Sequence, residues 1–290
     1  MPTLRAGVFS RTIYAEHTHE ETSKLDATQA YANADFIPDA GSYIDQWLDA
    51  AEAFRSREAA IGRARLNHAY GAGERQKLDL FHPSGLAKGL VVFVHGGYWL
   101  RFDRGYWSHF AAGAVSRDWA VAMPSYTLAP EARVRDITLE IARAVEAASA
   151  LVRGPIVLTG HSAGGHLVAR MGCRDVALDP EVRDRVRHIL PVSPVSDLRP
   201  LIETAMNAEL RLDPGEAERE SPVLHPVPDM PVTVWVGTEE RPVFLDQARW
   251  LSEVWAAPLR MAAGRHHFDV IDDLEVPDSP LVTALLGEAE

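Results

Sequence analysis

The sequence predicts an α/β fold with a mostly parallel central sheet and helices on both of its faces. Short apolar runs that suit buried strands alternate along the chain with longer segments whose apolar residues recur at helical spacing. This alternation is typical of βαβ units, in which neighbouring strands run parallel. The chain has 290 residues, of which 47% are hydrophobic, and it can therefore bury such a sheet in a large core.

The elements follow from these patterns in chain order. In 42–60, Tyr43, Trp47 and Phe54 recur at helical spacing, which predicts an amphipathic helix with one buried stripe. Residues 1–41 are expected to be an arm that packs over another part of the chain. Strands are expected at 76–81, 90–94, 120–123, 156–158, 189–192, 232–236 and 259–262, and helices at 106–116, 137–151, 162–171 and 243–255. We therefore expect an arm and helix in 1–66 and one large domain in 67–290.

Composition excludes several classes of function. The 41 acidic and 29 basic residues give a net charge of -12, which argues against nucleic acid and against a membrane surface as partners. Cys173 is the only cysteine, so neither an intramolecular disulfide nor a cysteine-based structural zinc site is expected. No segment has the roughly 18 apolar residues of a membrane span. We expect a cytoplasmic protein with a small-molecule substrate, and a homodimer is compatible with the sequence.

The segment Thr159–His166 carries the first candidate catalytic residue. It reads TGHSAGGH, and Ser162 stands between two glycines at the spacing G-x-S-x-G, after one expected strand and before a helix. That context suits a nucleophile elbow, in which glycines permit a tight turn and the serine hydroxyl is exposed at its tip. The alternative is a serine that only caps the helix. A serine nucleophile needs a base from elsewhere in the chain.

The base and its acidic partner are expected late in the chain. His266 and His267 follow the last expected strand, and we favour His267 as the base because Phe268 can hold its loop in place. The carboxylate that orients it is expected after 232–236, where Glu240 is preferred. Glu239 and Asp197 remain as alternatives for this carboxylate.

The turn after 90–94 predicts an oxyanion hole. It reads His95, Gly96, Gly97, Tyr98 and Trp99, and its backbone N–H groups can point at a developing negative charge. The predicted donors are the N–H groups of Gly97, Tyr98 and Ala163. No nucleotide-binding glycine motif and no zinc spacing occurs, so we expect no cofactor and no metal.

With these motifs the sequence resembles the α/β-hydrolase family over about residues 67–290. The H-G-G-Y-W turn, the G-H-S-A-G-x-H elbow and the acid-x-P-x-F segment that begins at Glu240 resemble the kynurenine formamidases of the arylformamidase type, which are related to hormone-sensitive-lipase-type esterases. The resemblance implies an α/β-hydrolase fold in which Ser162, Glu240 and His267 form the triad. The family usually has Asp where this chain has Glu240. The arm and helix are expected to pack on or near the active site of the domain in 67–290.

The resemblance implies hydrolysis of an aryl formamide, N-formylkynurenine being the usual substrate. His95, Gly96, Trp99 and Phe244 are expected in the substrate pocket, and Arg101 or Arg241 is a candidate for binding a substrate carboxylate. The alternatives are a carboxylesterase or general amidase that acts on small acyl groups, and a binding protein with the hydrolase fold but without catalysis.

Overall fold

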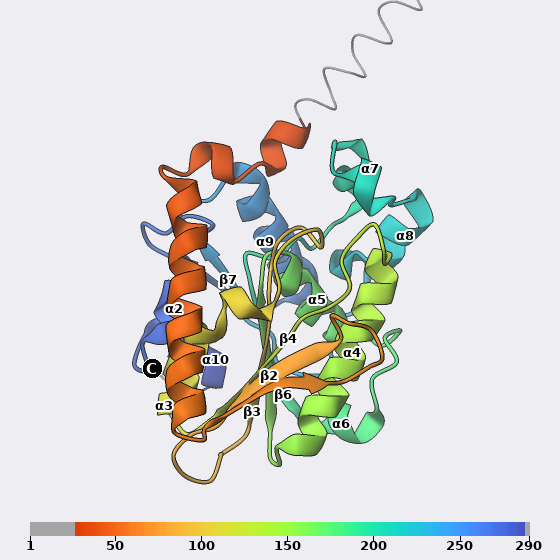
Figure 1. Ribbon diagram of the computed structural model, residues 1–290. Coiled ribbons are helices and arrows are strands. Elements are labelled where there is room, and N and C mark those ends of the chain that lie inside the picture. Colours follow the sequence, from red (N-terminus) through yellow and green to blue (C-terminus); the bar gives the residue numbers. More distant parts are fainter. Residues whose placement is uncertain (1–26, 288–290) are drawn as a thin grey trace, which may run out of the picture.

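The computed structural model describes residues 27–287, which form one eight-stranded sheet covered by helices on both faces (Figure 1). The strands are β1 (Ala64–Ala69), β2 (Lys77–Phe81), β3 (Leu90–Val94), β4 (Ala120–Pro124), β5 (Ile156–His161), β6 (Val186–Val192), β7 (Val234–Gly237) and β8 (Leu259–Ala262). Their order across the sheet is β1-β2-β4-β3-β5-β6-β7-β8. β1 and β2 pair antiparallel, β2 pairs antiparallel with β4, and the pairs from β4 to β8 are parallel. The predicted mostly parallel sheet is confirmed.

The helices divide between the two faces of this sheet. They are α2 (Ala40–Ala60), α3 (Ala112–Ser116), α4 (Val134–Leu151), α5 (Ala163–Gly172), α6 (Pro180–Arg185), α7 (Asn207–Leu210), α8 (Pro214–Arg219), α9 (Pro242–Trp255) and α10 (Pro280–Leu286). α4, α5 and α9 pack on the face that carries Val92 and Val94 of β3. α2, α3 and α10 pack on the face that carries Val91 and Phe93, because successive side chains of a strand point to opposite faces.

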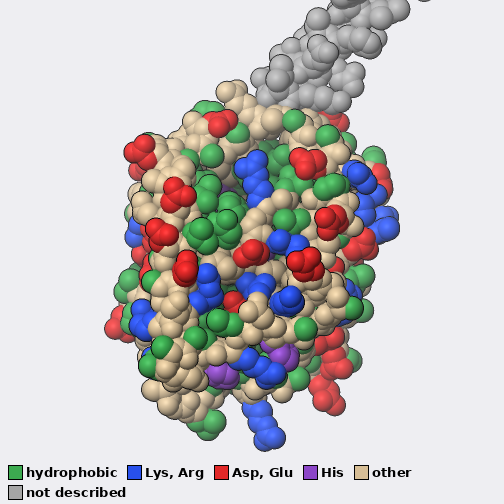
Figure 2. All heavy atoms as spheres, viewed as in Figure 1, with side chains coloured by type: hydrophobic (Ala, Val, Ile, Leu, Met, Phe, Trp, Pro, Cys, Tyr) green, Lys and Arg blue, Asp and Glu red, His purple; other side chains and the backbone are tan. Residues whose placement is uncertain are grey.

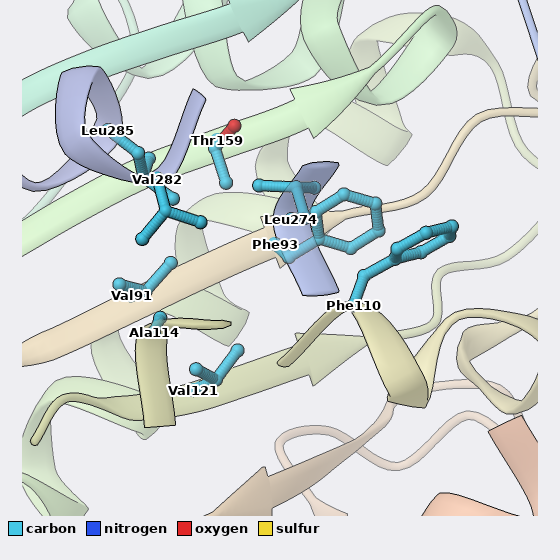
Figure 3. Close-up of a pocket in the computed structure, with 9 residues that line it drawn as sticks. All are labelled: Val91, Phe93, Phe110, Ala114, Val121, Thr159, Leu274, Val282 and Leu285. Atoms are coloured by element: carbon cyan, nitrogen blue, oxygen red, sulfur yellow. The ribbon is translucent and has the colours of Figure 1, made fainter. Parts of the chain in front are cut away.

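The layer between the sheet and α3 and α10 contains a small internal cavity, shown in Figure 3. Its lining is apolar except for Thr159, whose hydroxyl donates a hydrogen bond to the Leu190 carbonyl at 2.7 Å. No free side-chain donor is left in this lining, so the cavity is a gap in the core rather than a site for chemistry.

Two elements differ from the sequence prediction. β1 was not predicted, since its residues alternate between half-buried and exposed and form no apolar run. Residues 66 and 67, between which the sequence placed the start of the large domain, both belong to this strand. The helix expected at 106–116 was wrong in most of its length: the segment forms short 3₁₀ turns, η2 (Arg104–Tyr106) and η3 (Ser108–Ala111), and α3 is only five residues long. A side-chain bond from Asp103 to the Gly105 N–H supports the first of these turns.

The segment before α2 lies against the rest of the chain from residue 27 onward, while residues 1–26 of the expected arm lie outside the described residues. Side-chain hydrogen bonds attach it: Thr28 Oγ1 accepts from the Ala205 N–H at 2.8 Å, and Gln247 Nε2 donates to Tyr31 Oη at 2.8 Å. Within 27–287, none of the helices has the length and apolar character needed to cross a membrane. On the face in Figure 2, hydrophobic and basic side chains gather beside α2.

Candidate active site

Ser162 lies in a sharp turn between β5 and α5. Its backbone angles, φ 57° and ψ −116°, are ones that residues with a side chain rarely adopt, and its N–H donates to the Val192 carbonyl at 2.9 Å. The two neighbouring glycines are required sterically. A Cβ on Gly164 would lie 1.9 Å from the Val94 carbonyl oxygen, and one on Gly160 would lie 2.5 Å from the Gly164 carbonyl oxygen. The turn has the strand-to-helix form of a nucleophile elbow.

Glu240 and His267 are joined by a hydrogen bond in which His267 Nδ1 donates to Glu240 Oε2 at 2.6 Å, and both side chains are buried. A carboxylate only accepts hydrogen bonds, so the proton lies on Nδ1 and Nε2 is left as an acceptor. The other oxygen of Glu240 accepts from the Ser193 hydroxyl and, at 3.1 Å, from the Gly237 N–H. These bonds hold the carboxylate, and through it the tautomer of His267, in place.

The two alternative carboxylates lie elsewhere. Glu239 is exposed. Asp197 accepts from Arg199 Nε at 2.9 Å and from Arg199 Nη2 at 2.7 Å. Although burial raises the pKa of Asp197, these bonds lower it more, so its pKa is below the usual value. The structure therefore brings Glu240, and neither alternative, to His267.

His266 has a structural environment. Its Nε2 lies 3.2 Å from Tyr43 Oη, and its Nδ1 accepts from the backbone N–H of Phe268 at 3.1 Å. Nε2 thus fastens the loop to α2, while Nδ1 holds the loop's own backbone.

His161, which precedes the nucleophile candidate, was not predicted to have a role. Its Nε2 donates to the His267 carbonyl at 2.8 Å, and the centroids of the two rings are 4.6 Å apart. Burial lowers the pKa of His161 well below the usual value, and the neighbouring His267 lowers it further. His161 is therefore neutral and holds the backbone that carries His267. Nothing in the sequence pattern distinguishes it from the other buried histidines.

Three backbone N–H groups near Ser162 have no acceptor among the described residues. Two of them lie in the turn after β3 and the third is at the start of α5. Gly97, Tyr98 and Trp99 all have positive φ, of 109°, 56° and 59°. Within the described chain, the N–H groups of Gly97, Tyr98 and Ala163 donate to no other residue. Successive N–H groups in such a conformation form a concave site for negative charge. These are the three donors that the sequence predicted for an oxyanion hole.

Ser162 and His267 line one cavity, which encloses about 520 Å³ when the solvent at its mouth is counted. The Ser162 hydroxyl forms no hydrogen bond with another described residue, so it is free to react. The full lining is Asn33, Ala34, Ile44, Trp47, Gly97, Tyr98, Arg101, Phe102, Trp107, His161, Ser162, His267 and Phe268. Aromatic rings make up much of this wall, and α2 contributes Ile44 and Trp47 to it.

The four residues predicted for the substrate pocket do not line this cavity. Trp99 is fully buried with its ring edge-on to His166, and Phe244 is fully buried against His267 at 4.3 Å between centroids. His95 stacks on Tyr126 at 4.3 Å, and its Nδ1 donates to the Gly96 carbonyl. Burial lowers the pKa of His95 to about 4, so its ring is neutral. The His95, Trp99 and Phe244 side chains support the site from behind, because the turn that carries His95 and Trp99 folds both of them into the core.

The structure separates the two arginines considered for a substrate carboxylate. Arg101 lines the cavity and forms no ion pair or side-chain hydrogen bond with another described residue. Arg241 instead donates to the Gln29 carbonyl at 3.2 Å, and its guanidinium lies 3.5 Å from the centroid of the Phe36 ring. Arg241 therefore fastens the N-terminal segment, and Arg101 is the candidate ligand of an anion.

One group of potential metal ligands occurs in the described chain, at Cys173, Asp175 and His225. Both carboxylate oxygens of Asp175 are bound by Arg170, at 3.0 and 2.6 Å. Burial raises the pKa of the Cys173 thiol to about 11, which disfavours the thiolate that metals bind. We assign no metal to this group, because a cationic guanidinium already occupies its carboxylate.

Comparisons with known proteins agree with the α/β-hydrolase fold. Residues 91–258 match the sequence profile of a family described as the alpha/beta hydrolase fold. Kynurenine formamidase of Danio rerio is 26% identical over 263 residues, which cover 85% of this chain and 89% of that protein. Kynurenine formamidase of Drosophila melanogaster is 28% identical over 232 residues, covering 72% and 76%. A solved structure from Silicibacter sp. TM1040, described as a "putative thioesterase", is 52% identical with a TM-score of 0.88 and covers 90% of this chain and 99% of its own.

Proposed function

This chain belongs to the alpha/beta hydrolase fold family, and from that premise we propose that it is a serine hydrolase that cleaves an aryl formamide, such as N-formylkynurenine, into formate and the free aryl amine. The observation that carries the proposal is the single cavity that contains Ser162, the His267 ring bound to Glu240, and unused N–H groups. The similarity to two kynurenine formamidases over most of the chain supports the formamide as substrate.

In the first half of the reaction, Ser162 Oγ attacks the formyl carbon while His267 Nε2 takes the hydroxyl proton. Nε2 is free for this task because Nδ1 carries the ring proton and donates a hydrogen bond to Glu240. The imidazolium that forms is stabilised by the Glu240 carboxylate. The negative oxygen of the tetrahedral intermediate accepts from the N–H groups of Gly97, Tyr98 and Ala163.

In the second half, His267 gives its proton to the leaving nitrogen, and the carbon–nitrogen bond breaks. The aryl amine departs and leaves the formyl group on Ser162. A water molecule then attacks this ester as His267 takes one of its protons. The proton returns to Ser162 Oγ as formic acid leaves, and the acid ionises to formate in solution. His267 therefore acts as base and acid in turn.

The cavity wall supports a flat leaving group. Trp47, Trp107 and Phe268 supply aromatic surface, and Trp47 and Trp107 lie 4.8 Å apart between ring centroids. Aromatic rings bind planar substrates through large apolar contact and offset or edge-on packing. An aniline-type leaving group fits such a wall.

The test measures formate release from N-formylkynurenine with the wild-type protein and with Ser162→Ala. We expect wild-type turnover that falls by at least about 10,000-fold in Ser162→Ala, because the residual rate comes from binding and oxyanion stabilisation alone. Labelling by a fluorophosphonate probe should be lost in the same variant. Wild-type protein that leaves the formamide intact, or labelling that persists in Ser162→Ala, would contradict the proposal.

A second candidate function is hydrolysis of a small ester or thioester by the same residues. It is favoured by the 52% identical solved structure that is described as a "putative thioesterase". Comparing kcat/KM on N-formylkynurenine, para-nitrophenyl acetate and acetyl-coenzyme A separates the two. A high value on either of the last two, with no formate released from the formamide, would favour the second function.

A further inference from the structure

A second hollow lies next to the cavity of Ser162. The two share Asn33, Ala34, Tyr98 and Arg101, so these residues form the wall between them. The outer hollow encloses about 890 Å³ when its open side is counted, and it is lined further by Leu100, Asp35, Met206 and Glu209 together with Thr28, Tyr31, Ala32 and Ala205. A substrate bound at Ser162 has this wall as a neighbour. The polar and charged groups of this wall therefore indicate which chemical groups the substrate carries beyond the part that reacts.

Asn33 supplies a buried acceptor without a partner in this wall. Its side chain is 3% exposed, and Oδ1 has no hydrogen bond. The orientation of the amide follows from its neighbours. The Tyr98 hydroxyl donates its one hydrogen bond to the Tyr31 carbonyl at 2.7 Å, so it can only accept from Asn33, whose Nδ2 lies at 2.9 Å. Oδ1 is thus the atom left over. An unpaired buried acceptor is rare in proteins and points to a donor supplied by a ligand.

Three charged groups without ion-pair partners line the same two hollows. Arg101 is exposed on the wall, and Asp35 and Glu209 are exposed on the lining of the outer hollow. None of the three forms an ion pair with another described residue. Burial raises the pKa of the Tyr98 phenol to about 12, and among the smaller contributions Arg101 lowers this pKa while Asp35 raises it. The charges of Arg101 and Asp35 therefore act on the same side chain, in opposite directions.

We propose that this wall binds the amino-acid tail of the substrate's leaving group, with Arg101 on the tail carboxylate and Asn33 Oδ1 on its ammonium group. The inference rests on the proposed function, because it describes the leaving group of the same reaction. Asp35 and Glu209 make the hollow attractive to the ammonium, and Arg101 alone attracts the carboxylate. The substrate class is then an acylated aromatic compound with a zwitterionic α-amino-acid side chain.

The arrangement separates reaction from selection. The formyl carbon binds at Ser162 beneath the oxyanion turn, the aromatic ring lies along the aromatic wall, and the tail extends past Tyr98 toward the outer hollow. Arg101 follows the oxyanion turn closely, since its backbone N–H donates to the Gly97 carbonyl at 3.0 Å. A tail held by Arg101 is therefore tied to the turn that binds the oxyanion.

The test uses two matched pairs of substrates. N-formyl-L-kynurenine is compared with ortho-formamidoacetophenone, which has the same aryl formamide without the tail, and O-acetyl-L-tyrosine is compared with para-tolyl acetate. For each enzyme, the ratio of kcat/KM with the tail to kcat/KM without it is measured. Because each ratio comes from one enzyme, a general disturbance of the site cancels.

We expect Arg101→Met to lower this ratio about tenfold, mainly through KM. Arg101→Lys should lower it less. At high salt the difference between the wild type and Arg101→Met should shrink, because salt screens the ion pair. Asn33→Ala should lower it about 10- to 100-fold, since a bond to a charged group is lost. Arg260→Met, which removes an exposed arginine outside both hollows, should leave the ratio unchanged.

Ratios that stay unchanged in Arg101→Met and Asn33→Ala, or fall equally in Arg260→Met, would overturn the proposal. Failure of the proposed function has a different signature: the wild-type protein would then cleave the esters but neither formamide. In that case the ester pair alone still decides whether the wall binds the tail.

Discussion

The two walls of the cavity differ in how the chain builds them. One, which we call the sheet wall, consists of His161, Ser162 and His267 at the carboxyl end of the sheet. The other, the covering wall, consists of Asn33, Ala34, Ile44 and Trp47 from the segment before α2 and from α2 itself. The first carries the groups that we propose react with the substrate, and the second closes the cavity over them.

The sheet wall is held by the backbone, whereas the covering wall is attached by side chains. Ser162 lies between a strand and a helix in a turn that only glycine neighbours allow. The covering segment depends instead on bonds such as those that Tyr98 makes to the Tyr31 carbonyl and to Asn33. We propose that the chemistry is built into the fold, while the selection of substrate lies on a segment that can change without disturbing the sheet.

The largest effect is expected from Glu240→Gln in the sheet wall. An amide can donate to His267 Nδ1 where the carboxylate can only accept, so the imidazole loses the tautomer that leaves Nε2 free. We expect kcat to fall by about 1,000- to 10,000-fold with little change in KM, measured as formate or ester product release. The matched control is Glu239→Gln, an exposed neighbour, which should change kcat less than about twofold. Equal losses in the two variants would remove the distinction between these glutamates.

The next effect concerns stability and compares a glycine in each region. A methyl group on Gly164 would lie 1.9 Å from the Val94 carbonyl oxygen, a contact that backbone atoms cannot relieve cheaply. Gly164→Ala should therefore lower the free energy of unfolding by about 3 kcal/mol or more, as overpacking of a rigid core does. In α2, a Cβ on Gly41 would meet nothing within 4 Å, so Gly41→Ala should be neutral or slightly stabilising. Urea unfolding of both variants measures this difference. A Gly164→Ala protein as stable as the wild type would contradict the steric requirement for glycine at this position.

Tyr98→Phe tests the connection between the two walls. The change leaves the Tyr31 carbonyl and Asn33 Nδ2 without their partner, which should cost about 1–3 kcal/mol of unfolding free energy. Because the Tyr98 N–H is one of the proposed oxyanion donors, we also expect kcat to fall about tenfold, well short of the loss from removing a donor outright. Tyr106→Phe is the control, since that hydroxyl bonds no other described residue. A stability loss with unchanged kcat would show that the arm does not position the turn.

The difference between the walls also explains what could be predicted from the sequence. The apolar strand at 90–94 and the serine between two glycines are local patterns, and the parallel sheet then brings the residues after its strands to one edge. The covering wall has no such pattern: Asn33 matters because its partner Tyr98 is 65 residues away, and His161 because it bonds a backbone atom 106 residues away. The misplaced pocket residues Trp99 and Phe244 follow from the same limit, since the direction of a side chain at a turn depends on backbone angles that the sequence pattern does not specify.

The smallest effect is expected outside both walls, in the acidic segment that follows His267. Burial, and next the charge of Asp269, raise the pKa of Asp272 to about 7 in the folded protein, against 3.8 for the ordinary group. A raised carboxyl pKa means that the folded state favours the protonated form, so stability present below pH 4 is lost as the pH rises through about 7. Asp272→Asn keeps the neutral form at every pH. It should therefore raise Tm at pH 8 and change it little at pH 4, with kcat unaffected.

Asp45→Asn is the control for this last comparison, because Asp45 is exposed on α2 and forms no ion pair with another described residue. Its effect on Tm should be the same at both pH values. Thermal unfolding at pH 4 and pH 8 measures both variants. If Asp272→Asn instead lowers Tm at pH 8, the attraction between Asp272 and Arg265, whose charged atoms are 3.9 Å apart, outweighs burial and the repulsion from Asp269. If it also lowers kcat, the acidic segment supports the His267 loop, and the sheet wall depends on residues after His267 as well as on its own backbone turns.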